Sequence, residues 1–225
     1  MLSIIPTPIW NKEDITLRAL RLLREIDTFF AEDPNTTKKL MLMHEIDYKN
    51  PGKKRYKFNS FLTDKQREHY IEVAKTQNVG LVCEAGTPGL SDPAKEFIKQ
   101  CWIHDIPFEI LPGATALIPA VISSNWNTTQ FWFWGFLPKK KGKQTAFQKI
   151  IASEYPIYVY ESVHRIEKTL EEIQKAWFVW QVMICRELTK MHEQYANGSI
   201  PELLEKIKNN QIPLKWEFVL GFYNS

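Results

Sequence analysis

The 225-residue sequence contains no apolar run approaching about 18 residues and no basic-then-apolar segment at its start. The first absence argues against a membrane-spanning helix, and the second argues against a secretory signal. We therefore expect a cytoplasmic protein with no membrane partner. The three cysteines, Cys83, Cys101 and Cys185, are widely spaced without a Cys-x-x-Cys pair. This spacing argues against a disulfide framework, and because no His/Cys cluster has metal-ligand spacing we expect no metal.

Glycine is scarce as well, with 9 residues against 8 tryptophans, whereas glycine makes up about 7% of an average protein. The other bulk values, 44% hydrophobic and 24% charged residues, are typical of a soluble globular protein. The net charge of +3 is too small to indicate nucleic-acid binding by itself. The cluster Lys139–Lys143 either contacts phosphate or forms a solvated loop.

Short apolar runs alternate with segments of helical periodicity along the whole chain. Strands are expected at 2–5, 79–83, 107–111, 131–135, 157–160, 181–186 and 216–222, and helices at 13–27, 36–43, 64–77, 92–101, 113–123, 143–152, 164–176 and 201–208. Asn11 or Asp14 is a suitable cap for the first helix. The polar, basic residues 44–60, interrupted by Pro-Gly, are expected to form a mobile loop.

Strands separated by helices predict an α/β fold with largely parallel pairing. We expect two α/β lobes, residues 1–115 and 116–225, with a ligand cleft between them.

The segment "GLVCEAGTPGLSDP" at residues 80–93 is the most informative part of the sequence. A buried strand ends in an acidic residue and is followed by a glycine-rich turn, whose backbone can approach a ligand closely. The spacing matches neither a phosphate loop nor a dinucleotide fingerprint. A tight strand-to-helix turn with Asp92 capping the next helix is the alternative interpretation of this segment alone.

Seven segments in order, "IPTPIWNKEDITLRALR", "AEDPNTTKKL", "CEAGTPGLSDP", "LPGATA", "FWGFLPKKK", "YESVHRI" and "RELTKMHE", resemble one family. This is the ribosomal RNA small subunit methyltransferase I group of the tetrapyrrole methylase-like (class III) methyltransferases. The resemblance implies two α/β domains, a homodimer, and S-adenosylmethionine in the interdomain cleft. It also implies 2'-O-methylation of a cytidine ribose in small-subunit (16S) rRNA, either free or within the 30S subunit.

The resemblance also implies which residues bind the methyl donor. They are Pro8, Glu84, Gly86, Thr87, Leu90, Thr115, Ala116, Tyr160, Glu161 and Lys215. A carboxylate such as Glu84 and backbone dipoles are compatible with the positive charge of a sulfonium donor. The reaction is an in-line displacement, so the protein mainly supplies positioning.

The segment "RELTK" supplies the catalytic candidates Glu187, Lys190 and Arg186. A ribose hydroxyl is a poor acid, so a base or hydrogen-bond acceptor near it helps. Lys190 needs a lowered pKa to act as a base but none to contact phosphate. Arg186 and Glu187 have a simpler alternative, which is an ion pair with each other.

Other polar residues of the motifs carry weaker expectations. We expect His164 and His192 to be packed or hydrogen-bonded rather than catalytic. Glu32 and Asp33 could order the donor pocket or approach the acceptor ribose.

Two alternatives to this function remain open at the sequence level. One is a methyltransferase of the same fold that acts on a tetrapyrrole or another small molecule. The other is a non-catalytic RNA-binding or ribosome assembly factor, particularly if Trp10 blocks the cleft.

Four tryptophans, at positions 10, 102, 177 and 216, stand where the family pattern has glycine. Trp10 lies in a strand-to-helix turn, and Trp216 lies at the start of a strand. Trp102 and Trp177 lie where a helix ends. Such sites favour a positive φ, which glycine adopts easily and which strains a bulky residue. We therefore hypothesise that UGA codons encoding glycine were translated as tryptophan, with Trp126 and Trp180 as weaker members of the set. A base-stacking role of Trp10 is the competing interpretation, and it accounts for one position only.

Overall fold

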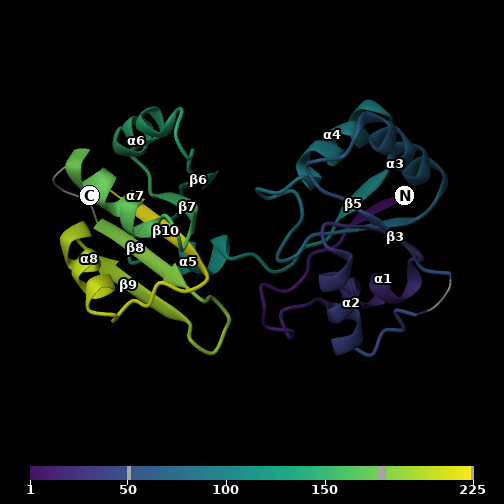
Figure 1. The fold of residues 1–225 in the computed structure, drawn as a ribbon, viewed down its shortest axis with the longest axis horizontal. Helices are drawn as coiled ribbons and strands as arrows, with labels where there is room; N and C mark the ends of the chain where they lie inside the picture. Colours follow the sequence, from purple (N-terminus) through teal and green to yellow (C-terminus); the bar gives the residue numbers. More distant parts are fainter. Residues whose placement is uncertain (50–51, 177–180, 224–225) are drawn as a thin grey trace. The chain divides into compact units, whose positions relative to one another are not determined.

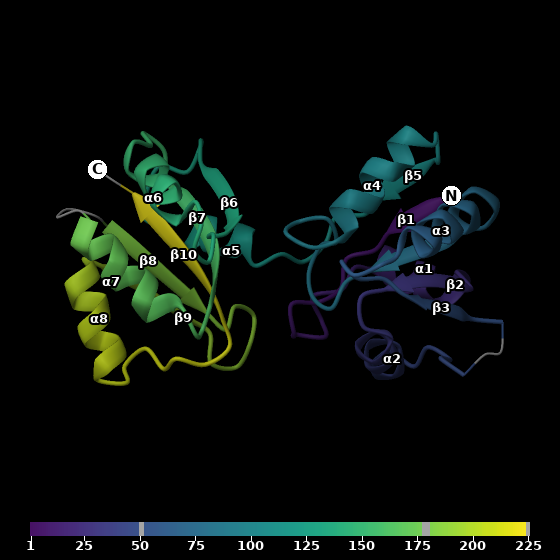
Figure 2. The same cartoon turned by 45° about the horizontal axis from the view of Figure 1, so that its top comes forward.

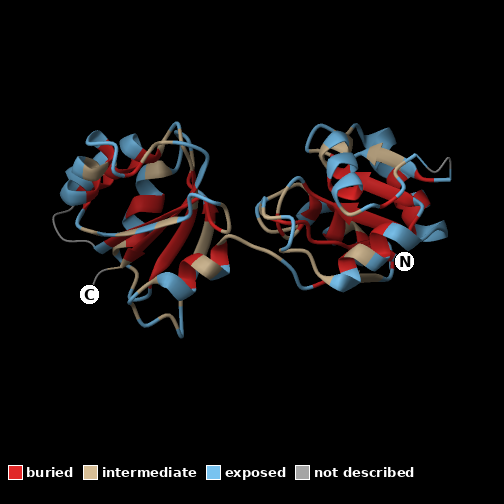
Figure 3. Ribbon diagram, turned by 90° about the horizontal axis from the view of Figure 1, so that it is seen from below, coloured by how far each residue is buried: buried red, intermediate tan, exposed pale blue. Residues whose placement is uncertain are grey.

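The computed structural model describes residues 1–49, 52–176 and 181–223. The chain forms two compact units, Met1–Thr115 and Ala116–Ser225, and each unit is described by itself (Figure 1). The central strands of both sheets are almost entirely buried (Figure 3). No helix within the described ranges is long and apolar enough to cross a membrane.

Unit 1 is built on a five-stranded sheet in the order β3-β2-β4-β1-β5, and every neighbouring pair is parallel. Its strands are β1 (Leu2–Ile4), β2 (Thr28–Ala31), β3 (Lys54–Lys57), β4 (Val79–Val82) and β5 (Phe108–Ile110). Its helices are α1 (Leu17–Glu25), α2 (Pro34–Met43), α3 (Asp64–Thr76) and α4 (Ala94–Ile103). Residues of α1 and α2 form one core with the sheet, and residues of α3 and α4 form the other. The central strands are therefore apolar on both faces, as is usual in parallel sheets.

Unit 2 contains a second five-stranded sheet in the order β6-β7-β10-β8-β9. Its strands are β6 (Trp132–Phe136), β7 (Ile157–Ser162), β8 (Gln181–Arg186), β9 (Gln194–Gly198) and β10 (Glu217–Tyr223). Its helices are α5 (Leu117–Ser123), α6 (Lys143–Ile151), α7 (Ile166–Ala176) and α8 (Ile200–Lys208). Helices α6, α7 and α8 supply the main core on one face of this sheet. Val182 and Ile184 of β8 belong to this core, so the alternate residues Met183 and Cys185 face the other side of the sheet, where the Ser123 hydroxyl of α5 contacts both.

The expectation of largely parallel pairing is wrong for unit 2. Only β6 and β7 are parallel, whereas β10 runs antiparallel to both β7 and β8, and β8 runs antiparallel to β9. The last strand returns between two earlier ones, and an apolar pattern carries no information about strand direction.

Local predictions fail in three places. Strands β2, β3 and β9 were not expected, and β3 lies in the segment interpreted as a mobile loop. The first helix begins at Leu17, where the Thr16 hydroxyl accepts a hydrogen bond from the backbone N–H of Ala19 (3.1 Å), so neither Asn11 nor Asp14 is its cap. Helix α5 begins at Leu117 rather than near residue 113.

Candidate functional site

The glycine-rich loop that follows β4 is fixed to the turn after β1. Thr7 and Gly86 form an antiparallel bridge with N–H···O distances of 2.9 and 3.1 Å. The buried Thr7 hydroxyl donates to the carbonyl oxygen of Cys83 at 3.4 Å. Gly86 has φ of 81°, in the left-handed region that favours glycine. The loop is therefore a positioned backbone element, and Thr7 is a positioning residue that the sequence analysis did not identify.

Two further contacts close this loop. The Thr87 hydroxyl donates to the carbonyl oxygen of Ala114 at 2.9 Å. A Cβ atom at Gly86 would lie 3.3 Å from Cγ2 of Ile9 and 3.5 Å from the same carbonyl oxygen. The Asp92 carboxylate accepts from the N–H groups of Gly89 (2.9 Å) and Ala94 (2.8 Å). Asp92 was expected to cap the next helix; the cap residue is Pro93, and Asp92 lies one position before it.

Carboxylates lie beside this backbone at the carboxyl end of the sheet. The Glu84 side chain is exposed, and its backbone N–H donates to Oε2 of Glu32 at 3.3 Å. Burial, followed by the charges of Glu84 and Asp92, raises the pKa of Glu32 above its ordinary value. A cationic ligand group here would reduce the repulsion among these carboxylates, so the residues present fit a sulfonium donor.

Six of the predicted donor residues belong to unit 1. The bridge and the Thr87 hydrogen bond bring three segments together, namely the turn containing Pro8, the loop containing Glu84, Gly86, Thr87 and Leu90, and the end containing Thr115. Pro8 is buried, and Leu90 is half-buried. The predicted cleft between lobes stays a prediction, because Ala116, Tyr160, Glu161 and Lys215 belong to unit 2.

In unit 2 the sheet register brings the predicted residues of β7 and β8 and those before β10 to one end of the strands, whereas Ala116 lies outside the sheet at the start of α5. Because β10 is antiparallel, its residue Phe218 lies opposite both Glu161 of β7 and Arg186 of β8. Lys215 and Trp216 directly precede β10, so they reach the same end.

The Glu161 carboxylate is engaged within unit 2. Its side chain is buried, and it accepts from Arg165 at 2.6 Å, from the Thr169 hydroxyl at 2.9 Å and from the Ser162 N–H at 2.8 Å. A direct contact between this carboxylate and a donor would require one of these bonds to open. The neighbouring Tyr160 ring packs against Phe133 and Phe136.

The three catalytic candidates have distinct surroundings. Lys190 forms an ion pair with Glu187, with 2.8 Å between Nζ and Oε1, and its Nζ lies 5.2 Å from the ring centroid of Trp216. Arg186 donates to the carbonyl oxygen of His192 (3.4 Å) and to Oε1 of Gln194 (3.3 Å). The alternative of an Arg186–Glu187 ion pair is therefore wrong. The backbone turns sharply at Glu187, where φ is 55°.

The two histidines of the motifs, His164 and His192, have exposed side chains. We expected them to be packed or hydrogen-bonded rather than catalytic; exposure shows that the packed alternative is wrong and does not test the other.

The expectation of a positive φ at the tryptophans is confirmed at two positions and wrong at one. Trp10 has φ of 93° and Trp216 has φ of 69°. Trp102 lies inside α4, and the left-handed residue that ends this helix is Asp105, with φ of 51°. The physical reason for glycine at 102 is therefore wrong, and Trp177 and Trp180 lie outside the described residues. Trp126 packs between Tyr158 and Tyr223.

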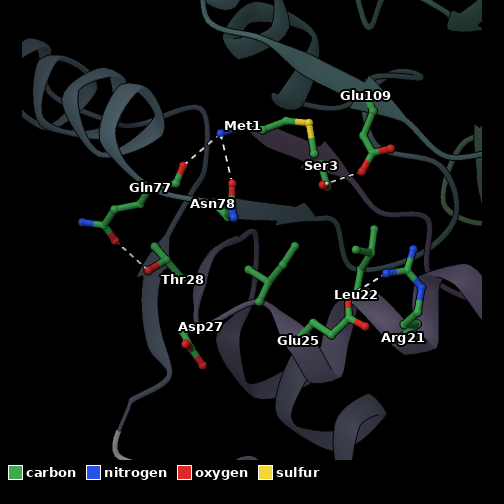
Figure 4. A pocket seen from close by; sticks show the side chains of 11 residues that line it. Met1, Ser3, Arg21, Leu22, Glu25, Asp27, Thr28, Gln77, Asn78 and Glu109 are labelled. Carbon is green, nitrogen blue, oxygen red and sulfur yellow. Dashed lines mark hydrogen bonds and ion pairs between the residues drawn. The ribbon is translucent and has the colours of Figure 1, made fainter.

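A separate cavity of about 620 Å³ lies at the amino end of the sheet of unit 1, away from the glycine-rich loop (Figure 4). Its polar groups bond mainly to one another, including Ser3 to Glu109 (2.9 Å) and Thr28 to Gln77 (2.9 Å). No residue predicted to bind the donor lines it. No cluster of three or more His, Cys, Asp or Glu residues is arranged to hold a metal in the described ranges.

Comparison with known proteins agrees with this geometry. A family model described as Tetrapyrrole (Corrin/Porphyrin) Methylases matches residues 1–204. The chain is 37% identical to a Ribosomal RNA small subunit methyltransferase I from Hydrogenobaculum sp., over 97% of this chain and 94% of that protein. It is 33% identical to the protein of that name from Thermotoga maritima, over 93% of each.

Solved structures with the same fold are more distant in sequence. A uroporphyrin-III C-methyltransferase from Thermus thermophilus, complexed with S-adenyl homocysteine, has a TM-score of 0.66 and 15% identity, covering 99% of this chain and 97% of that one. A diphthine synthase has a TM-score of 0.70 and 12% identity, covering 100% and 90%.

Proposed function

Because the chain belongs to the tetrapyrrole methylase family, and within it to the ribosomal RNA small subunit methyltransferase I group, we propose that it methylates small-subunit rRNA. The donor is S-adenosylmethionine, and the acceptor is the 2'-hydroxyl of a cytidine ribose. The observation that carries the proposal is the glycine-rich loop, fixed by Thr7 and Ala114 beside the carboxylates of Glu32 and Glu84. Acting on ribosomal RNA, the protein would work in the cytoplasm.

The residues of the chain divide the work between binding and acceptor chemistry. The donor supplies an activated methyl group, and the loop around Gly86 holds and orients it. Positioning accounts for most of the acceleration of an in-line transfer. Near the acceptor, the ion pair of Glu187 and Lys190 offers an oxygen that can accept the hydroxyl proton and an ammonium that can contact phosphate.

Donor binding is tested by substituting Gly86 with alanine. In Gly86→Ala, the added Cβ would fill the space beside Ile9 and Ala114, and the strained φ would move the loop. We expect calorimetric titration with S-adenosylmethionine to show at least a tenfold loss of affinity. The control Gly142→Ala has a similar φ of 87° but 4.0 Å of clearance, so it should bind the donor like the wild type. Equal affinities of all three proteins would contradict this role of the loop.

The reaction is tested by transfer of labelled methyl groups to unmethylated small subunits and to free rRNA. We expect labelled 2'-O-methylcytidine after nuclease digestion. Donor binding without transfer to either RNA would remove the rRNA assignment, and absence of donor binding would favour the non-catalytic alternative.

The proposal includes a homodimer formed through unit 2. Four large apolar side chains are exposed on two of its elements, Ile118 and Ile122 on α5 and Trp132 and Phe136 on the edge strand β6. Such residues usually become buried on association. Sedimentation velocity should give a dimer for the wild type and for the control Leu17→Asp, and a monomer for the double variant Ile122→Asp/Trp132→Asp. A monomeric wild type would refute the dimer.

A further inference from the structure

One segment of unit 1 is strongly cationic, as is the lysine-rich segment 139–149 of unit 2. Residues 34–57 contain seven Lys or Arg and two Asp or Glu, a net charge of +5. Because the whole chain carries +3, the remaining residues sum to −2. The modest net charge therefore conceals a local cationic region.

This segment folds at one border of the sheet. It comprises α2 and the edge strand β3, which pairs only with β2 (Figures 1 and 2). The two elements meet at Tyr48, where the guanidinium carbon of Arg55 lies 3.5 Å and Nζ of Lys38 lies 5.6 Å from the ring centroid. Arg55 and Lys57 share this face of β3, whereas Lys54 lies on the opposite face with Tyr56, which packs against the core of α3 and α4. The cations of α2 and β3 therefore lie along the border of the sheet and flank its edge strand on both faces.

Most of the lysines on this surface are not neutralised. Lys38, Lys39, Lys54 and Lys57, which we call the cationic edge, are exposed, and none has a described carboxylate within 4.0 Å. Lys53 differs, since its ammonium is buried and donates to carbonyl oxygens at the end of α1. The sheet edge therefore presents cations without close ion pairs to solvent, although the charge of Lys57 interacts with the Asp33 carboxylate. Exposed lysines on an edge strand also discourage pairing with another strand.

An exposed aromatic ring lies at the end of the cationic edge. Phe61, in the loop after β3, is 87% exposed. In a parallel sheet the carboxyl ends of all strands meet at one border, so this loop and the glycine-rich loop after β4 are on the same side of the sheet. A chain of phosphates along β3 would thus lead toward the donor loop.

We propose that the cationic edge binds the phosphate backbone of the RNA acceptor and that Phe61 stacks on one of its unpaired bases. The inference rests on the proposed rRNA substrate, and it specifies which surface of unit 1 binds that RNA. Lysines bind phosphate without sequence preference, and an aromatic ring accepts any base face. The binding energy therefore comes from charge and stacking, and the choice of nucleotide lies elsewhere.

The test compares two sets of three lysines. The edge variant is Lys38→Gln/Lys54→Gln/Lys57→Gln, and the control replaces three exposed lysines outside both this edge and the 139–143 cluster, Lys99→Gln/Lys168→Gln/Lys208→Gln. The affinity of each protein for a small-subunit rRNA fragment is measured at several KCl concentrations. Loss of three phosphate contacts should make the negative slope of log K against log[KCl] shallower by about 2 for a single strand. Phe61→Ala should weaken binding about fivefold or more and leave the slope unchanged.

Several outcomes would overturn the inference. One is an edge variant that has the affinity and the salt slope of the wild type. Another is a control variant that loses as much affinity for rRNA as the edge variant. A third is a loss of affinity for assembled subunits but not for free rRNA, which would indicate a ribosomal protein as the partner. Titration with S-adenosylmethionine should be unchanged in both variants, which shows that they remain folded. Methyl transfer by the wild type is measured in parallel, so that failure of the proposed function is distinguished from failure of this surface.

Discussion

Trp10 provides a test of backbone strain that does not depend on any assay of activity. Its φ of 93° lies where residues other than glycine are strained, whereas Trp102 has helical geometry inside α4. Both belong to unit 1 and have largely exposed indoles, 62% and 73% respectively. We propose comparing alanine with glycine at each position, because both substitutions remove the indole and its contacts equally. The difference between the two variants then reports the backbone alone.

The two positions should give differences of opposite sign. A left-handed conformation costs an alanine about 1–2 kcal/mol, while glycine loses about 0.5–1 kcal/mol through its greater freedom in the unfolded chain. Trp10→Gly should therefore be more stable than Trp10→Ala by about 0.5–1 kcal/mol. Within helix α4, Trp102→Gly should be less stable than Trp102→Ala by about 1 kcal/mol.

Urea unfolding followed by far-UV circular dichroism measures these free energies of unfolding. If Trp10→Gly is less stable than Trp10→Ala, as expected for the same pair at position 102, the left-handed backbone at residue 10 is refuted. Position 216, with φ of 69°, should behave like position 10 in the unfolding of unit 2. Peptide masses of the protein from its natural source should then show glycine at 10 and 216. Tryptophan at both positions 10 and 216 would refute the codon hypothesis.

Three further predictions concern buried groups of unit 1. Burial raises the pKa of Cys83 to about 12, so at pH 8 its thiol should react with a disulfide reagent only after unfolding. Burial also raises the pKa of Glu32, so the native state holds this proton more tightly than the unfolded state. The free energy of unfolding should therefore decrease as pH rises from about 4.5 through the raised pKa of Glu32. In Glu32→Gln, urea unfolding measured over the same pH range should show a smaller decrease, because this carboxyl is absent. Lys53→Met should lower the free energy of unfolding by about 2–3 kcal/mol, because Nζ donates to the carbonyls of Leu23, Arg24 and Ile26.

Apolar periodicity located most elements but not all of them. The strand at 181–186 has the predicted bounds because it is almost continuously apolar. The helix at 64–77 ends one residue earlier than predicted; its start is fixed by the capping box of Thr63 and Gln66 rather than by apolar residues, which occur only in its second half. Strand β3 was missed because an edge strand needs no apolar run, and its Lys-Arg-Tyr-Lys sequence resembles a loop. The antiparallel direction of β10 could not be predicted, because it depends on the tertiary arrangement of β7 and β8, between which β10 pairs.

The candidate site was predictable from motif order but not in its contacts. The glycines and the acidic residue of the loop after β4 were expected from the sequence, whereas the bridge from Thr7 arises only when the turn after β1 folds beside it. Arg186 and Glu187 are adjacent in sequence, yet the left-handed backbone at Glu187 directs the two side chains to different partners.

The left-handed residues of the chain separate into two groups with different causes. Among the described residues, eight that are not glycine have positive φ. Glu45, Asp105 and Asn210 follow the caps of α2, α4 and α8, where such a residue normally ends a helix. The other five have no such role, and all lie in the loops of the candidate sites, namely Trp10, Ser91, Glu187, Thr189 and Trp216. Strain of this kind persists where the surroundings hold it in place for function, which applies to Ser91, Glu187 and Thr189. If positions 10 and 216 are glycine in the natural protein, their positive φ is an ordinary glycine conformation in the same loops. The backbone thus marks the same loops as the sequence motifs, by an argument that uses neither resemblance nor side-chain chemistry.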